Sequence, residues 1–400
     1  MSCQRFVILF CACLFLVLGL VGAFNRVVDP FWYYRDVEIA GFNSVKTKFS
    51  RFERHVKPAI VARDKPQALI FGRSFAEIGF DPLNAAFTHD GALAGYNFGL
   101  AGTSSEVVPC YLEYALAVTD IKRVVIGISP GQIPAVDCRR KLPDIGQIRY
   151  VTLLLSASAF KASLETVMGQ EREQPSHTAA GLYFYTRGEP GTDRRFREFF
   201  QIRKQHEPAC GLAAGRVGAP QSVSGEMAKF EVADSIDLGG LRQMVRLAVA
   251  REIELRIVAY PRHAHSLELD FLCGTAHRNW QALLQIADLI EREGGPGVQL
   301  WEFYGYNAVT GEPIASAPAR YWQDPEHFNY EVGNVILNEM FGAPARAGLF
   351  NGRLGRRVTP SNVGASYRDF LLERNAFLRD NPWFYPALSD LFGMPVNVAR

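Results

Sequence analysis

The chain lacks the features that identify a partner by charge or by metal ligands alone. Its 400 residues carry 43 basic and 41 acidic side chains, so no net charge favours binding to nucleic acid. The seven cysteines include no C-x-x-C pair, which argues against a structural zinc site. The sequence has no internal repeat and no low-complexity tract. Beyond one stretch near the amino terminus it has no long apolar run, which argues against a multi-pass membrane protein.

That stretch runs from Phe6 to Phe24 and contains 19 residues without a charge. At about 1.5 Å rise per residue, a helix of this length approximately spans the core of a bilayer. Arg5 precedes the run, which favours a cytoplasmic amino terminus. Two interpretations stay open: an uncleaved signal anchor, which the length favours, and a signal peptide cut after Val21-Gly22-Ala23. In both cases the rest of the chain is exported.

Disulfides can form in an oxidising compartment, which the exported part of the chain is expected to reach. Three cysteines belong to the anchor region, and four lie in the exported part: Cys110, Cys138, Cys210 and Cys273. Four cysteines allow three pairings, among which the sequence does not choose.

Short apolar runs alternate with helical patterns along the exported part, which predicts an α/β fold with a parallel sheet. We expect strands at 68–71, 123–128, 255–259 and 298–303, and helices ending near 118 and over 239–252, 276–292 and 331–340. A glycine-punctuated turn is expected at 95–102. The predicted organisation is an anchor (1–25), a connector (26–63), an α/β domain (64–341) with an insertion at about 138–235, and a carboxyl-terminal tail (342–400).

The most informative position is Ser74, directly after the first predicted strand and Gly72-Arg73. Open α/β sheets place their ligand sites at the carboxyl ends of strands, and a serine there is a nucleophile if a base reaches it. A candidate base lies far downstream, where His327 follows Asp324 by three residues. The alternative interpretation is that these residues are only turn and helix-cap residues. The nucleophilic interpretation predicts that Ser74 meets the Asp324/His327 pair in space.

Taken in order, these motifs resemble the SGNH/GDSL hydrolase superfamily, and especially its membrane-anchored bacterial branch, which includes alginate O-acetylation proteins and the D-alanyl lipoteichoic acid transfer protein. Gly72-Arg73-Ser74 is similar to the first block, with arginine in place of the usual aspartate. Asn97-Phe98-Gly99 resembles the second block, and Asp324-Pro325-Glu326-His327 resembles the last. The third block, Gly-x-Asn-Asp, is absent, and Ser129-Pro130-Gly131-Gln132 stands after the corresponding strand.

The resemblance implies a three-layer, flavodoxin-like parallel sheet flanked by helices. It also implies a catalytic triad of Ser74, His327 and Asp324, and an oxyanion hole to which Gly99 and Asn97 contribute. Arg73 has no required role in that scheme and is a candidate for binding a carboxylate or phosphate of the substrate.

The function that we expect is an exported serine acyl-ester hydrolase or O-acyltransferase acting on an envelope or secreted polysaccharide. It would be held in the inner membrane by a single helix, with its domain in the periplasm. A transferase would need an acyl donor, which implies a multi-pass membrane acyltransferase as partner. The alternative is a non-catalytic binding or scaffold subunit of a polysaccharide modification or export assembly, which the missing third block favours.

Neither a metal nor a cofactor is expected. His263 and His265 alternate, and alternating histidines on an extended strand face the same way and can share a metal. No third ligand of suitable spacing accompanies them, so we expect them in an exposed loop.

Overall fold

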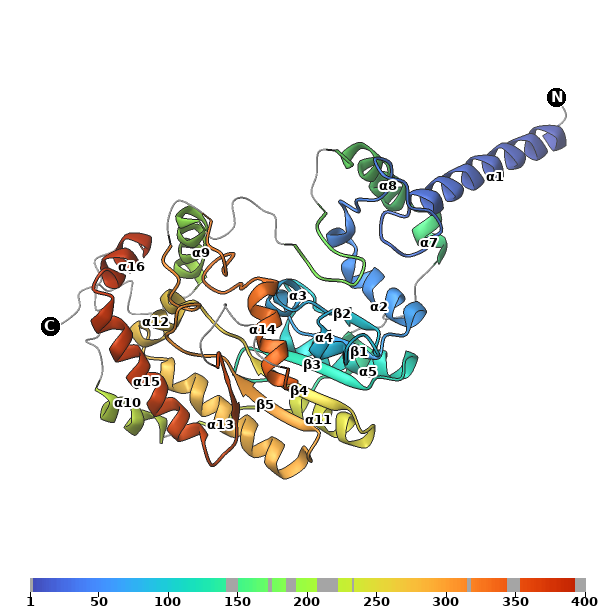
Figure 1. Cartoon of the computed structure of the whole chain (residues 1–400). Coiled ribbons are helices and arrows are strands. Elements are labelled where there is room, and N and C mark those ends of the chain that lie inside the picture. Colours follow the sequence, from blue (N-terminus) through green and yellow to red (C-terminus); the bar gives the residue numbers. More distant parts are fainter. Residues whose placement is uncertain are drawn as a thin grey trace.

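The computed structural model describes residues 3–141, 150–171, 175–184, 192–206, 222–231, 234–314, 318–343 and 353–392. It shows a mostly parallel sheet flanked by helices, with one long amino-terminal helix that projects away from the domain (Figure 1).

The sheet has six strands in the order β2-β1-β3-β4-β5-β6. The first five are parallel to their neighbours, and β6 is antiparallel to β5. The order 2-1-3-4-5 is that of flavodoxin-like doubly wound sheets. Their bounds are β1 Ala68–Phe71, β2 Gly95–Asn97, β3 Arg123–Ile128, β4 Glu254–Ala259, β5 Val298–Glu302 and β6 Arg356–Val358.

Two connected groups of helices pack on this sheet. Helix α14 (Tyr330–Met340) contacts α3 (Ser74–Gly79) and α4 (Ala85–Thr88), while α11 (Gly239–Ala250) contacts α5 (Val108–Val118) and α13 (Ala276–Glu293). The central strands are buried along their length, as expected for a parallel sheet covered by helices. The other helices are α2 Glu53–Asp64, α6 Cys138–Lys141, α7 Tyr150–Leu155, α8 Ala157–Gly169, α9 Asp193–His206, α10 Val223–Phe230, α12 Ala264–Leu272, α15 Val363–Asp380 and α16 Phe384–Phe392, with short 3-10 turns at Phe49–Arg51 and Ser105–Val107.

The predicted α/β order is confirmed, including the four predicted strands and the helices between them. Two predictions about the ends of the sheet were wrong. Residues 95–97 form the edge strand β2, because their backbone pairs with β1, although the surrounding glycines are typical of a turn. The expected tail beyond 342 is part of the domain in its described portion, since β6 extends the sheet and α15 packs on α13.

The predicted insertion at 138–235 is divided among separate places. Helices α7 and α8 pack against α1 (Cys3–Val28), whereas α9 packs against α16 at the other end of the molecule (Figure 1) and α10 packs against α13 and α15. Its described parts therefore do not form one separate subdomain.

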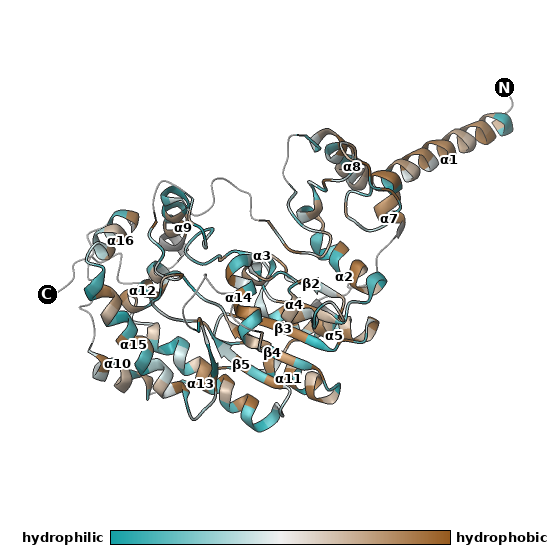
Figure 2. Ribbon diagram, in the orientation of Figure 1, coloured by the Kyte–Doolittle hydropathy of each residue, from teal (hydrophilic) through white to brown (hydrophobic). Residues whose placement is uncertain are grey.

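Helix α1 is the candidate for a membrane span. It has 26 residues, a mean hydropathy of 2.9 over its most apolar window, and no part of that window is buried in the protein. Figure 2 shows α1 as mostly hydrophobic along its length, with a hydrophilic tip at its amino end. Length and composition make this helix able to cross a membrane, and a signal sequence has the same properties.

One disulfide joins Cys110 of α5 to Cys138 of α6, which selects one of the pairings that the sequence left open. Cys273 is disulfide-bonded as well. The three cysteines of α1 are free and exposed.

Candidate active site

Ser74 lies at the point where the connections of the sheet change direction. The chain passes from β1 to β2 on one side and then to β3 on the other, so the loops after β1 and β3 diverge at this point. Ser74 is the first residue of α3, directly after β1. The tight turn before it needs glycine: Gly72 has φ +147°, and a Cβ there would lie 2.4 Å from the hydroxyl oxygen of Tyr260.

Ser74, His327 and Asp324 form one hydrogen-bonded chain. The distance from Ser74 Oγ to His327 Nε2 is 2.8 Å, across 253 residues of sequence. His327 Nδ1 lies 2.7 Å from Asp324 Oδ2. Because an ionised carboxylate only accepts, Nδ1 carries the proton and Nε2 is left to accept from the serine hydroxyl. The three side chains thus have the relation of nucleophile, base and orienting acid.

The Asp324 carboxylate is held by its own loop. Its Oδ1 accepts the backbone N–H groups of Glu326 and His327, each at 2.9 Å, while Oδ2 accepts the imidazole. Asp324 is 4% exposed. Burial would raise its pKa, but the charge and hydrogen bond of His327 and the two backbone donors lower it. Asp324 therefore stays ionised and fixes the tautomer of the histidine.

The imidazole of His327 is enclosed and electrostatically tuned. The ring of Phe75 stacks on it with a centroid distance of 4.7 Å. Burial lowers the pKa of His327, but Asp324 outweighs it through its charge and hydrogen bond, so the pKa lies above 6.5. Arg195, on α9, has the opposite influence and lowers this pKa. Arg195, which lies in the predicted insertion, therefore influences the pKa of His327. Nothing in the sequence distinguishes it from the other arginines of α9.

Asn97 and Gly99, predicted to donate to an oxyanion, have their donors occupied inside the fold. Asn97 Nδ2 donates to the carbonyls of Ala76 and Phe80, each at 2.8 Å, and its Oδ1 accepts the N–H of Gly99 at 2.9 Å. Asn97 is fully buried. The structure thus contradicts the oxyanion prediction for both residues, and it shows that Asn97 ties β2 to the helix that begins with Ser74.

Two further groups lie near the Ser74 hydroxyl: the backbone N–H of Ser74 and the side chain of Arg73. As the first residue of α3, Ser74 has no acceptor for its N–H within the helix. Arg73 precedes it at the cap position with an exposed side chain. Among the described residues no ion pair to Arg73 is found, and the residue is exposed beside Ser74.

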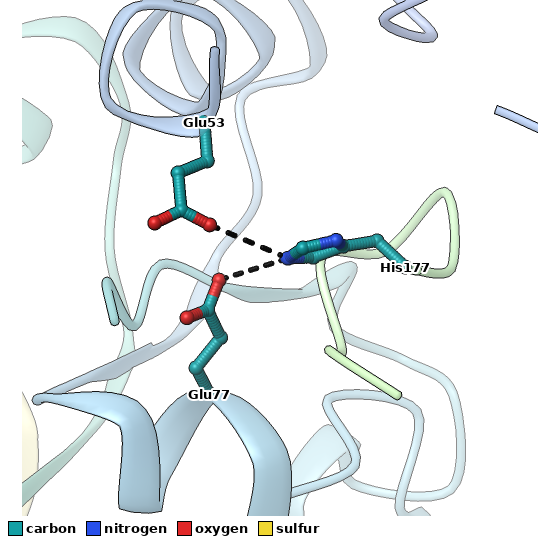
Figure 3. A group of neighbouring side chains, drawn as sticks. All are labelled: Glu53, Glu77 and His177. Carbon is teal, nitrogen blue, oxygen red and sulfur yellow. Dashed lines mark hydrogen bonds and ion pairs between the residues drawn. The ribbon is translucent and has the colours of Figure 1, made fainter. Parts of the chain in front are cut away.

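A buried charged cluster of Glu53, Lys57, Glu77 and His177 lies behind α3. His177 Nε2 is 3.0 Å from Glu77 Oε1 and 3.5 Å from Glu53 Oε2 (Figure 3). Lys57 Nζ is 2.6 Å from Glu77 Oε1 and 2.7 Å from the carbonyl of Gly99. The two glutamates and the histidine could hold a metal ion. The lysine ammonium already supplies a cation there, so a divalent ion would face like charge.

Glu77 stands three residues after Ser74 on the same short helix. Its Oε2 accepts the N–H of Ala101 at 2.7 Å. Burial raises the pKa of Glu77, but Lys57 and His177 together bring it down to about 2. The cluster therefore ties α3, the helix that begins with Ser74, to α2. The sequence contained no spacing that would have revealed it.

The expectation that His263 and His265 lie in an exposed loop was wrong. Both are fully buried, and their rings stack with a centroid distance of 4.8 Å. The N–H of His265 donates to His263 Nδ1 at 3.2 Å, and His263 Nε2 lies 2.8 Å from the carbonyl of Glu312. Burial lowers the pKa of His263 to about 4, so this histidine is a neutral core residue at physiological pH.

No known protein-family model matches the chain, and no curated protein matches it either.

Proposed function

We propose that this chain is a membrane-anchored, SGNH-like serine enzyme that hydrolyses or transfers an O-linked acyl group, acting on an envelope or secreted polysaccharide. The single observation that supports this is the chain of hydrogen bonds from Ser74 through His327 to Asp324. Its position at the switch point of a doubly wound parallel sheet adds to that support.

In this proposal Ser74 Oγ attacks the carbonyl carbon of an acyl ester while its proton passes to His327 Nε2. The tetrahedral intermediate collapses, the alcohol leaves with the proton from His327, and the acyl group stays on Ser74. Water or a sugar hydroxyl then attacks the acyl-serine by the reverse proton path. Asp324 holds the imidazole and stabilises the imidazolium that forms at each step.

The oxyanion needs at least one donor, and the proposal assigns the backbone N–H of Ser74, which has no acceptor within α3. One such donor contributes on the order of 3 kcal/mol of transition-state stabilisation. Arg73 is proposed as the binding group for an anionic part of the substrate, because its exposed guanidinium stands next to the nucleophile.

We place the domain on the exported side of the inner membrane, with α1 as a single-pass anchor. The packing of α7 and α8 on α1 supports an anchor over a cleaved signal peptide, because α1 then contributes contacts to the folded chain. Residues 21–23 lie within this helix and next to the part that packs on α7. A transferase of this kind would receive its acyl group from a multi-pass acyltransferase in the same membrane.

A second candidate is a non-catalytic binding or scaffold subunit of a polysaccharide modification or export assembly. The observation in its favour is that both side-chain and backbone donors predicted for the oxyanion hole, at Asn97 and Gly99, are used elsewhere. This candidate predicts binding of acylated polysaccharide without turnover.

The test is acyl-ester turnover by the full chain in detergent, with p-nitrophenyl acetate and an O-acetylated polysaccharide as substrates. Ser74→Ala and His327→Ala should each abolish turnover, because each removes a group that acts on the reacting atoms. Ser129→Ala is the matched control, since Ser129 is an exposed serine just after the neighbouring strand β3. His55→Ala controls for loss of an exposed histidine.

Turnover that survives both Ser74→Ala and His327→Ala would reject the site. Binding of the polysaccharide by a wild-type chain that hydrolyses neither substrate, and that transfers no acetyl group when the membrane fraction is added, would favour the scaffold.

A further inference from the structure

The inference begins with the length of α1 that is free of protein contacts. Every described residue from Cys3 to Val17 is exposed, as are Gly19 and Leu20, but the uncharged part of this stretch begins only at Phe6. Phe6 to Leu20 is 15 residues, or about 22 Å of helix at 1.5 Å per residue. A bilayer core is about 30 Å thick. The free part of α1 is therefore too short to cross the membrane by itself.

The whole uncharged run, from Phe6 to Phe24, has the required length. Its 19 residues give about 28 Å of helix. The boundary of the hydrocarbon core then falls near Asn25 and Arg26. Arg26, the first charged residue after the run, is exposed, pairs with Asp36 at 2.6 Å and lies over the ring of Tyr34, so its charge stays outside the apolar run.

Helix α7 sits against α1 at this same level. Asn25 Nδ2 donates to the carbonyl of Leu154 at 2.7 Å. One turn closer to the membrane, Leu155 Cδ2 lies 3.3 Å from the position that a Cβ on Gly22 would occupy. Because Gly22 has no side chain, α7 can approach α1 closely there. Leu155 therefore lies beside the apolar run of α1, before the run ends at Phe24.

The sequence of α7, Tyr-Val-Thr-Leu-Leu-Leu, carries no charge. Leu153 is buried, but Val151 is 66% exposed and Leu155 is 37% exposed. Figure 2 shows α7 as hydrophobic beside the end of α1. Exposed apolar side chains that continue the surface of a membrane helix are suited to lipid, and interfacial helices bury their apolar face about 5–10 Å into the leaflet.

We infer that α7, through Val151 and Leu155, is a second and shallow membrane contact that enters the leaflet beside the end of α1. The inference rests on the proposed role of α1 as a retained anchor. A single helix would let the domain swivel about its axis, whereas two contacts hold it in one orientation. The second contact therefore fixes the orientation of Ser74 relative to the membrane that would hold the acyl donor.

The test measures the depth of single labels in the full chain. Val151→Cys and Leu155→Cys are made in a background with Cys3, Cys11 and Cys13 changed to serine. Each is labelled with an environment-sensitive fluorophore and reconstituted into vesicles of phosphatidylethanolamine and phosphatidylglycerol. Quenching is compared between lipids that carry a nitroxide near the headgroup and lipids that carry it near the chain end.

The expected result at 151 and 155 is quenching several-fold stronger by the shallow nitroxide than by the deep one. The matched control is Val249→Cys on α11, another exposed valine on a helix at 44% exposure, which should show no quenching. Leu16→Cys in α1, at 64% exposure, should be quenched by the deep nitroxide.

The outcomes distinguish a failure of α1 as an anchor from a failure of α7 as a second membrane contact. Loss of the Leu16 label from the mature chain, or no quenching there, would reject α1 as an anchor and with it this inference. Quenching at Leu16 with none at Val151 and Leu155 would overturn the inference alone. A photo-crosslinker at Val151 that captures a membrane protein in cells, without quenching in lipid vesicles, would overturn it in favour of a protein partner.

Discussion

Removing the ammonium group of Lys57 should destabilise the domain strongly. In Lys57→Met the ion pair with Glu77 is lost, and so are hydrogen bonds to the carbonyls of Gly99 and Gly181. Both side chains of the pair are fully buried, and breaking a buried pair by removing one partner costs about 3–5 kcal/mol. We expect a loss of that size in the free energy of unfolding at pH 8, because Glu77 is left as a buried charge.

The destabilisation of Lys57→Met relative to the wild type should become smaller as the pH falls. In the wild type the pKa of Glu77 is depressed to about 2, so its contribution is fully present above its unfolded value near 4.5 and is lost only toward pH 2. In Lys57→Met the burial of Glu77 is opposed by His177 but no longer by the lysine, the largest of the influences that lower its pKa, and we expect the pKa of Glu77 to rise above the unfolded value. The variant then gains stability by taking up a proton, and the gap to wild type is smaller at pH 5 than at pH 8.

The assay is urea unfolding of the full chain in detergent, followed by tryptophan fluorescence, with the change in stability taken from the midpoint and slope. Lys122→Met is the matched control. Its ion pair with Asp120 is exposed, at 52% and 76%, and such pairs contribute less than about 1 kcal/mol. The double variant Lys57→Met/Glu77→Gln should recover part of the loss, because it removes the unpaired charge.

A loss below about 1 kcal/mol in Lys57→Met at pH 8 would refute the reasoning, since it would equate a buried pair with an exposed one. A loss that is equal at pH 5 and pH 8 would also refute it, because the residual carboxylate would then carry no penalty.

Three further predictions concern the site and the disulfide. On the proposed mechanism, Asp324→Asn should lower kcat by about 10⁴-fold, the effect of losing the aspartate of a Ser-His-Asp triad. The pH midpoint of the remaining activity should move down, because Asp324 raises the pKa of His327, the proposed base. Asn97→Ala should lower the free energy of unfolding by about 3 kcal/mol, because the buried backbone groups that it contacts lose their hydrogen bonds. A large fall in kcat at unchanged stability would contradict this and would favour a role of Asn97 in the oxyanion hole. Replacing Cys110 and Cys138 with alanine should cost about 3–4 kcal/mol, given the 28-residue separation; an unchanged urea midpoint would contradict this.

Much of the fold follows from local sequence patterns. The apolar runs of β1, β3, β4 and β5 are short, bounded by turn residues and separated by amphipathic helices, so their positions could be predicted. The edges of the sheet could not. Residues 95–97 and 356–358 are strands because a neighbouring strand offers hydrogen-bonding partners, and that partner is not visible in three residues of sequence.

The sequence by itself determined which residue types were available for chemistry: a serine after a strand, an aspartate and histidine three residues apart, and one uncharged run of membrane length. Only the tertiary structure decided which of them meet. It joined Ser74 to His327 across 253 residues, and it committed Asn97 and Gly99 to holding α3 in place. It also buried a lysine among Glu53, Glu77 and His177, and placed α7 beside the end of α1. The physical reason is that hydrogen bonds and ion pairs depend on distances of about 3 Å between atoms, which the packing of distant elements sets.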